Sequence, residues 1–269
     1  MKRNRSIFII RHGERVDYTF KENENESYWL QKAFDASGSY KRFDKNMPKC
    51  LPSREGGHML YENDTPLTEI GYLQAKLTGQ SMKENGIEIA HVFCSPALRC
   101  VQTAAGLLEG MNEETTLGLN IEFGLFEWLF WLKFVPKWMT LEELANNDLG
   151  FSINTSYEPI LREDYLNPEE SLSDFYDRSH FIIRQILKKY PSGNILIVAH
   201  GASLDSCTRQ LTGGLPREID EFYDILHKTP YLACIQISES SSGEYNQVEH
   251  SIESISSAAV KLVRRSSGS

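Results

Sequence analysis

The chain carries the stretch IFIIRHG at residues 7–13, where a short run of Ile and Phe ends in Arg11 and His12. A second stretch of the same form, ILIVAHG, lies at residues 195–201 and ends in His200. Short continuous apolar runs are typical of strands buried on both faces of a parallel sheet. Ligands bind at the carboxyl edge of such sheets. We therefore expect both imidazoles at one edge, each followed by a glycine that lets a ligand approach the backbone.

The residues between these stretches show alternating strand and helix patterns. The first predicted element is a helix over about 68–83 with Ile70, Leu73, Leu77 and Met82 inward. The others are a strand over 91–94, a helix after Ser95-Pro96 with Ser95 as its cap, a strand near 120–123, and a helix that begins at Ser171 and ends before Pro191. Such alternation predicts an α/β fold with a mainly parallel central sheet and helices on both faces.

Two segments lack this pattern. Residues 17–64 show no clear period and are interrupted by glycines and prolines, so we expect an irregular insertion with one helix near 28–34. The last 19 residues contain seven serines and few aromatic residues, which predicts a flexible tail. We therefore expect one domain over residues 1–250 and a tail over 251–269.

Composition excludes several classes of protein. The 269 residues are 41% apolar and 24% charged, with a net charge of −9 and no long basic block, so we do not expect nucleic acid as a partner. No apolar run approaches ~18 residues, and the first one stops at Arg11, so neither a membrane span nor a signal peptide is expected. The five cysteines form no C-x-x-C pair and no zinc spacing, which predicts free thiols and a cytoplasmic location.

Three arginines accompany the two histidines. Arg11 and Arg15 flank His12, and Arg99 lies near the start of the helix that follows Ser95. Guanidinium groups bind phosphate oxygens in pairs and stay charged at physiological pH. Three arginines and two histidines near one point would suit a phosphoryl dianion.

Several motifs resemble those of a known family and follow one another in the same order. RHGER at 11–15, SPALRCVQTA at 95–104 and AHG at 199–201 resemble the motifs of the histidine phosphatase superfamily, whose fold is the phosphoglycerate mutase-like fold. More narrowly, the chain is similar to the phosphatase domain of the suppressor of T-cell receptor signalling proteins and to ecdysteroid-phosphate phosphatases. That similarity rests on YWL at 28–30, FDA at 34–36, NMP at 46–48, LT at 67–68 and GLFEW at 124–128.

The resemblance implies a three-layer fold and hydrolysis of phosphate monoesters. No H-E-x-x-H motif or carboxylate cluster appears, so no metal or cofactor is expected. His12 would attack phosphorus and form a phosphohistidine, and the phosphoryl oxygens would be bound by Arg11, Arg15, Arg99 and His200. The substrate would be a phosphotyrosine protein or a steroid phosphate, and the domain would form a homodimer. The signalling proteins also carry ubiquitin-associated and Src-homology modules, for which the residues before Ile7 leave no room.

An acid must protonate the leaving group, and the resemblance places it at Glu127. The apolar neighbours of Glu127 are expected to favour its protonated form. Glu14 is the competing carboxylate, but it follows His12 so closely that we expect it to point elsewhere. Gly201 stands where acid phosphatases of the superfamily carry an Asp, which also favours Glu127. Nothing in residues 17–64 resembles a mutase substrate loop, so we do not expect mutase activity.

Other interpretations stay open. The same residues could form a binding or scaffold module without turnover. The turn after residue 199 also approaches the nucleophile elbow of a serine hydrolase, with Ser203 as nucleophile and His227 or His250 downstream. No cysteine has an arginine six positions on, which excludes a cysteine-dependent tyrosine phosphatase. The aromatic group of residues 126–138 is either core, an apolar wall for the leaving group or a dimer surface.

Overall fold

A six-stranded sheet forms the centre of the computed structural model, which describes residues 5–114, 116–146 and 151–248. The strand order is β3-β2-β4-β1-β5-β6. The strands are β1 (Ser6–Arg11), β2 (His91–Cys94), β3 (Leu119–Ile121), β4 (Ile195–Ala199), β5 (Cys234–Glu239) and β6 (Tyr245–Gln247). The first four pair in parallel, as predicted, whereas β5 and β6 were not predicted and add an antiparallel edge.

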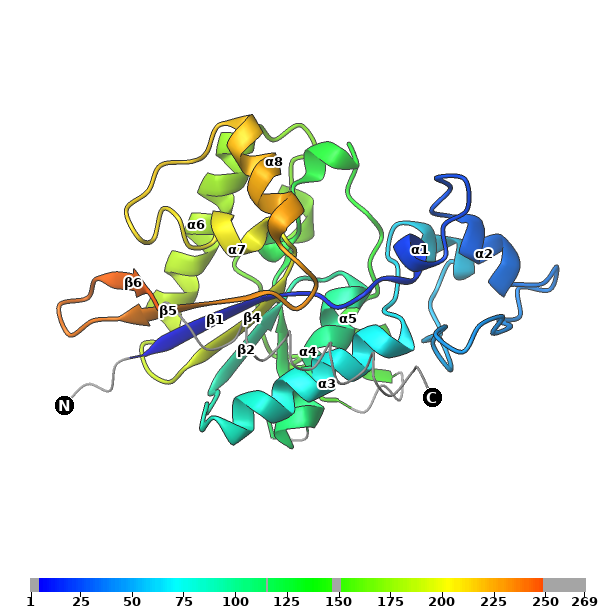
Figure 1. Ribbon diagram of the computed structural model, residues 1–269, viewed down its shortest axis with the longest axis horizontal. Helices are drawn as coiled ribbons and strands as arrows, with labels where there is room; N and C mark the ends of the chain where they lie inside the picture. Colours follow the sequence, from blue (N-terminus) through cyan, green and yellow to red (C-terminus); the bar gives the residue numbers. More distant parts are fainter. Residues whose placement is uncertain (1–4, 115, 147–150, 249–269) are drawn as a thin grey trace.

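Helices cover both faces of this sheet, so the α/β three-layer expectation is confirmed. They are α1 (Val16–Thr19), α2 (Tyr28–Ala33), α3 (Glu69–Glu84), α4 (Leu98–Met111), α5 (Leu141–Asn146), α6 (Leu172–Lys189), α7 (Ser203–Ser206) and α8 (Ile219–Lys228). Figure 1 shows α6, α7 and α8 on one face and α3 and α4 on the other. Alternate residues of β1 separate the two cores: Ile7 and Ile9 pack with α6, whereas Phe8 and Ile10 pack with α4.

The pairing of β1 with β4 determines where the site lies. These neighbours are parallel, and Arg11 is in register with Ala199. His12 and His200, one residue further along each strand, therefore leave the sheet at the same edge. The residue before each histidine is also the last residue of its strand, as the sequence predicts.

The predicted start of α6 is confirmed. Ser171 caps the helix by accepting from the backbone N–H of Asp174, and the Asp174 carboxylate accepts from the Ser171 backbone N–H in return. This reciprocal pair is a capping box, which satisfies two backbone donors that the first helical turn leaves unpaired.

The predicted cap of α4 is wrong. The helix begins at Leu98, and Ser95 does not cap it. Its first N–H instead donates to the carboxylate of Asp64, at 2.7 Å, and Asp64 is also bound by Arg54. A carboxylate at a helix N-terminus is favoured by the helix dipole as well as by the hydrogen bond. The insertion therefore supplies the cap.

The predicted inward face of α3 is confirmed at Met82, which is buried, and wrong at Leu73. Leu73 is 43% exposed, and the helix buries Gly71, Ala75 and Gly79 against its neighbours. A methyl group on Gly79 would overlap the carbonyl oxygen of Leu107 in α4. The two helices therefore approach backbone to backbone, and small residues rather than leucines form the contact.

The insertion over 17–64 is more ordered than its sequence suggests. It contains α2, as predicted, together with α1 and a 3-10 helix at His58–Glu62. Trp29, Met47 and Tyr61 are buried and belong to the same core as Phe8 and Ile10. Figure 1 shows α1 and α2 beyond the carboxyl end of β1, on the side where the histidines emerge.

Within the described residues, no helix has the length and apolar character needed to cross a membrane. The predicted tail, 251–269, and His250 lie outside the residues that the structure describes.

Candidate active site

The structure brings His12 and His200 together. Their ring centroids are 5.6 Å apart at an interplanar angle of 71°, and both side chains are buried. The sequence expectation that two remote strand ends place their imidazoles at one point is therefore met by the geometry.

His12 is held in the form a nucleophile needs. Its Nδ1 lies 2.9 Å from the carbonyl oxygen of Gly13, so Nδ1 carries the proton and donates, and Nε2 keeps a lone pair. Burial, followed by the positive charges of Arg99 and its neighbours, holds the pKa of His12 well below its usual range. The imidazole is therefore neutral around pH 7.

His200 is fixed on both ring nitrogens. Its Nδ1 accepts from Nη2 of Arg99 at 3.2 Å, because a guanidinium can only donate. Nε2 therefore carries the proton and donates to Ser95 Oγ at 2.8 Å. Burial and then the charge of Arg99 keep the pKa of His200 well below its usual range. The ring of Phe126 packs edge-on against it at 5.2 Å.

The three predicted arginines surround this pair of rings. Arg11 donates to the carbonyl of Thr229 and stacks on Tyr231, with Cζ 4.6 Å from the ring centroid. Its Nε is buried without a hydrogen-bond partner, and so is Nε of Arg99. Burial lowers the pKa of Arg11. Buried guanidinium N–H groups without partners are costly unless an anion binds them.

Arg15 is oriented by a neighbour that sequence reasoning missed. Burial opposes its charge, but the carboxylates of Asp17 and Glu127 outweigh this and raise the pKa of Arg15. Asp17 accepts from Nε at 3.0 Å and also pairs with Nη2. Thr65 donates to the same carboxylate at 3.1 Å. The positive charge therefore remains while the side chain is held in place.

Glu127 reaches the same centre from another segment. Its Oε1 accepts from Arg99 Nη2 at 2.5 Å, and its Oε2 lies 3.7 Å from Nδ1 of His200. The expectation of apolar surroundings is wrong for the carboxylate itself, which is paired with a cation and 17% exposed. Of its apolar neighbours in sequence, Phe126 packs on His200 within the same centre, whereas Trp128 packs against Phe222.

Comparison with known proteins agrees with this arrangement. A family model described as histidine phosphatase superfamily (branch 1) matches residues 53–245. The chain belongs to the histidine phosphatase superfamily. Among curated relatives, the ecdysteroid-phosphate phosphatase of Drosophila melanogaster is 42% identical over 88% of this chain and 31% of its own length. The human ubiquitin-associated and SH3 domain-containing protein B is 41% identical over 87% of this chain and 36% of its own.

Solved structures of similar fold include a phosphatase and a mutase. The ecdysone phosphate phosphatase from Bombyx mori, crystallised in complex with tungstate, superposes with a TM-score of 0.78 at 31% identity, covering 91% of this chain and 92% of that one. A phosphoglycerate mutase from Bacillus anthracis shares the fold, with a TM-score of 0.52 at 16% identity over 96% of this chain and 97% of that one. The chain spans about a third of the length of the curated relatives above.

Glu14, the rival carboxylate, has a structural role in this member of the superfamily. Its Oε1 accepts from Thr68 at 2.8 Å and from Asn46 at 3.1 Å. It therefore ties the residues after β1 to the insertion and to the start of α3.

The glycines that follow the histidines are required for packing, and ligand approach to them stays a prediction. A methyl group on Gly13 would lie 2.8 Å from the carbonyl oxygen of Gly71, and one on Gly201 would lie 3.1 Å from Leu226 and 3.3 Å from Nε of Arg11. The first glycine lets α3 pack against the His12 segment, and the second leaves room for a site arginine.

Sequence reasoning missed Asp17, Ser95 and Tyr231 as members of the site. Asp17 follows Arg15 by two residues, and that spacing could have suggested an ion pair. Ser95 was assigned to a cap. Tyr231 lies before the unpredicted strand β5, and no local pattern marks it.

The expected core role of the aromatic group of residues 126–138 is confirmed for part of it. Phe126, Trp128 and Trp138 are buried, whereas Phe130 and Phe134 are exposed.

Among the described residues, no three His, Cys, Asp or Glu side chains are placed to hold a metal ion.

The serine-hydrolase interpretation gains no support. Ser203 is buried, and its Oγ accepts from the backbone N–H of His200. The Asp205 carboxylate is bound by Tyr176 and Arg217. His227 stacks on Tyr223 in α8.

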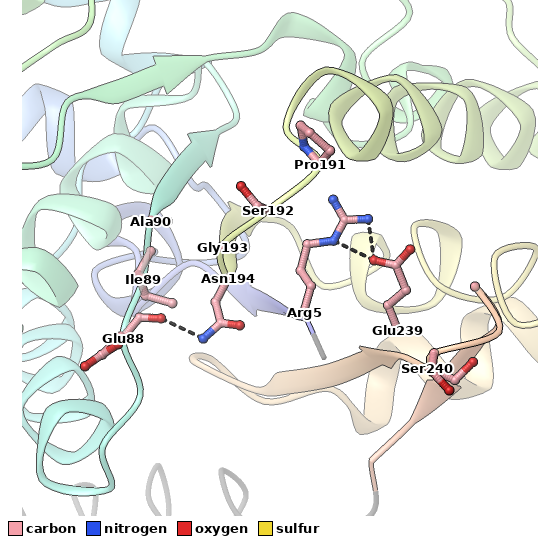
Figure 2. Close-up of a pocket in the computed structure, with 12 residues that line it drawn as sticks. Arg5, Glu88, Ile89, Ala90, Pro191, Ser192, Gly193, Asn194, Glu239 and Ser240 are labelled. Atoms are coloured by element: carbon pink, nitrogen blue, oxygen red, sulfur yellow. Dashed lines mark hydrogen bonds and ion pairs between the residues drawn. The ribbon is translucent and has the colours of Figure 1, made fainter. Parts of the chain in front are cut away.

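A hollow of about 500 Å³ lies at the amino edge of the parallel strands, opposite the histidines. Figure 2 shows two polar contacts there: Arg5 pairs with Glu239, and Asn194 donates to the backbone carbonyl of Glu88. These side chains support the ends of the strands.

Proposed function

We propose that this chain hydrolyses phosphate monoesters through a phosphohistidine at His12. The observation that carries the proposal is a neutral, buried imidazole among three arginines, two of which hold buried Nε–H groups without partners. A phosphoryl dianion satisfies those donors and neutralises the charges. The names of the phosphatase relatives support the same chemistry.

In the first step, Nε2 of His12 attacks phosphorus and the bond from phosphorus to the ester oxygen breaks. The leaving oxygen takes its proton from Glu127, which takes up that proton from solvent when the phosphoryl group replaces it on Arg99. Arg11, Arg15 and Arg99 bind the three remaining oxygens, where charge is held in the transition state. His200 orients Arg99, because its Nδ1 accepts from that guanidinium and its Nε2 donates to Ser95.

In the second step, water attacks the phosphohistidine. Glu127, now ionised, accepts a proton from that water, and the bond between phosphorus and Nε2 breaks. Inorganic phosphate leaves, and both His12 and Glu127 return to their starting forms.

The substrate proposed is a phosphotyrosine protein or a steroid phosphate, on the strength of the resemblance and the names of the relatives. Tyr231 beside Arg11 and Tyr18 beside Arg15 give the arginines aromatic neighbours, which suits a ring-bearing leaving group. Kinetics on a phosphotyrosyl peptide and on a sterol phosphate, compared by kcat/KM, separate the two classes.

Turnover of p-nitrophenyl phosphate tests the activity itself, with His12→Ala as the control. We expect release of p-nitrophenol by the wild type and none above background by the variant. A wild-type rate equal to that of His12→Ala would favour the scaffold alternative instead.

We also propose a homodimer and a cytoplasmic location. The first rests on the resemblance alone, and light scattering of the purified chain tests it. The second is supported by five unpaired cysteines, and imaging of the tagged protein in cells tests it.

A further inference from the structure

The segment that carries Glu127 is bound to the start of α6 by two charged side chains. Arg178 lies on α6, and Glu170 immediately precedes its cap. The two form an ion pair with Nη2 2.6 Å from Oε1, and both are nearly buried, at 9% and 4% exposure. The mechanism above uses neither of them.

Arg178 uses all five of its N–H groups at this place. Its Nη1 donates to the carbonyls of Gly124 at 2.8 Å and Phe126 at 2.9 Å, and its Nη2 donates to the carbonyl of Glu127 at 3.2 Å. Its remaining two bonds go to Glu170. A guanidinium has five donors in a fixed plane, whereas an ammonium has three on a flexible stem. Lysine therefore cannot reproduce this set.

Glu170 binds the other end of the same segment. Its Oε1 accepts from the backbone N–H of Leu129 at 3.2 Å, and its carbonyl accepts from the indole of Trp128 at 2.9 Å. The residues on both sides of Glu127 are thus tied to one ion pair.

Gly124 allows the segment to lie this close to α6. A methyl group there would overlap the side chain of Ile182. The backbone of Glu127 is therefore fixed on the α6 side, while its carboxylate extends to Arg99 on the other side.

We propose that Arg178 and Glu170 are positioning residues that hold Glu127 where it can protonate the leaving oxygen. The proposal rests on the proposed function. A displacement of about 1 Å can cost a reaction ~10²-fold. That loss should fall on the step that needs the proton rather than on binding of the phosphoryl group.

Leaving-group dependence tests the proposal. Phenyl phosphate releases a phenol with a pKa of about 10, as for tyrosine, whereas p-nitrophenolate leaves readily without a proton. We define the bias as kcat/KM on p-nitrophenyl phosphate divided by kcat/KM on phenyl phosphate, because this parameter reports the phosphorylation step. We expect Arg178→Lys to raise the bias about tenfold or more, and Glu127→Gln to do the same. In the double variant, Arg178→Lys should add little to the bias that Glu127→Gln already produces.

Arg5→Lys is the matched control. Arg5 pairs with Glu239 and donates to two backbone carbonyls, those of Leu187 and Tyr190, at the opposite edge of the sheet (Figure 2). It reproduces the chemistry of Arg178 away from the site. We expect Arg5→Lys to lower thermal stability and leave the bias within twofold of wild type.

The outcomes separate this inference from the proposed function. If the wild type hydrolyses neither ester, the proposed function fails. If it hydrolyses both, and Arg178→Lys lowers the two rates equally, the positioning role is wrong. Should Arg178→Lys not be recovered folded, Glu170→Gln, which keeps an acceptor for Leu129, is measured under the same expectation and the same contradiction.

Discussion

Arg99 donates from Nη2 to Glu127 Oε1 at 2.5 Å, so this cation of the candidate site is already paired with the carboxylate proposed as its acid. The same nitrogen donates to His200. A phosphoryl group that binds Arg99 must share or displace the carboxylate, which places Glu127 within reach of the ester oxygen.

Removing the charge of Glu127 should therefore strengthen binding of inorganic phosphate while it weakens catalysis. A hydrogen bond to a charged group contributes about 1.5–3 kcal/mol, so we expect Glu127→Gln to bind phosphate about tenfold more tightly. Calorimetric titration with phosphate measures this. Weaker binding than in the wild type would show that Glu127 assists the phosphate rather than competing with it.

Arg99→Lys should lower kcat/KM on p-nitrophenyl phosphate by about 10²–10³, because it removes preorganised donors from the transferring group. Arg162→Lys is the control, since Arg162 is 70% exposed and pairs with the exposed Asp164. It should keep full activity. Equal effects of the two changes would contradict the assignment of Arg99.

Asp17→Ala should destabilise the fold by about 3–5 kcal/mol, because it leaves the buried charge of Arg15 without its carboxylate. Urea unfolding measures the change. Asp164→Ala, at an exposed pair, should cost at most about 1 kcal/mol. A small loss for Asp17→Ala would mean that Arg15 is solvated in the absence of its partner.

The two histidines should make stability fall in mild acid. The pKa of each is lowered in the folded chain, so below the unfolded value of about 6.5 the unfolded state binds more protons. Stability is therefore complete above that pH and falls by about 1.4 kcal/mol per pH unit per histidine below it. His12→Gln should remove one histidine's share of this slope. If the free energy of unfolding changes equally with pH in wild type and His12→Gln between pH 7.5 and 5, the pKa of His12 is not lowered in the folded chain.

Local patterns predicted the elements that carry the histidines. The strands β1 and β4 are buried on both faces, and this burial is visible in the sequence as an uninterrupted run of apolar residues. The start of α6 was predictable because Ser171 and Asp174 form a local capping box. The convergence of His12 and His200 followed from parallel pairing.

Contacts between remote segments could not be predicted in this way. The cap of α4 comes from Asp64, far from Leu98 in sequence. The α3–α4 contact uses glycines, which carry no hydrophobic signal, so Leu73 was placed inward wrongly. Strand β5 lies near the sheet edge and is only partly buried, so its pattern is weak.

The contacts of Glu127 in the site could not be predicted from its sequence neighbours either. Its sequence neighbours are apolar, but its spatial neighbours are Arg99 and, through the backbone, Arg178. A residue's role in acid catalysis depends on those spatial neighbours, and the sequence alone does not specify them.

Trapping the covalent intermediate tests the central claim most directly. The chain is mixed with a phosphate ester, quenched in base within milliseconds, digested and analysed by mass spectrometry for phosphate on the peptide that contains His12. The account predicts an acid-labile, base-stable phosphate on His12 that is absent from His12→Ala. Turnover without any phosphate on that histidine, or with phosphate on a serine instead, would contradict it.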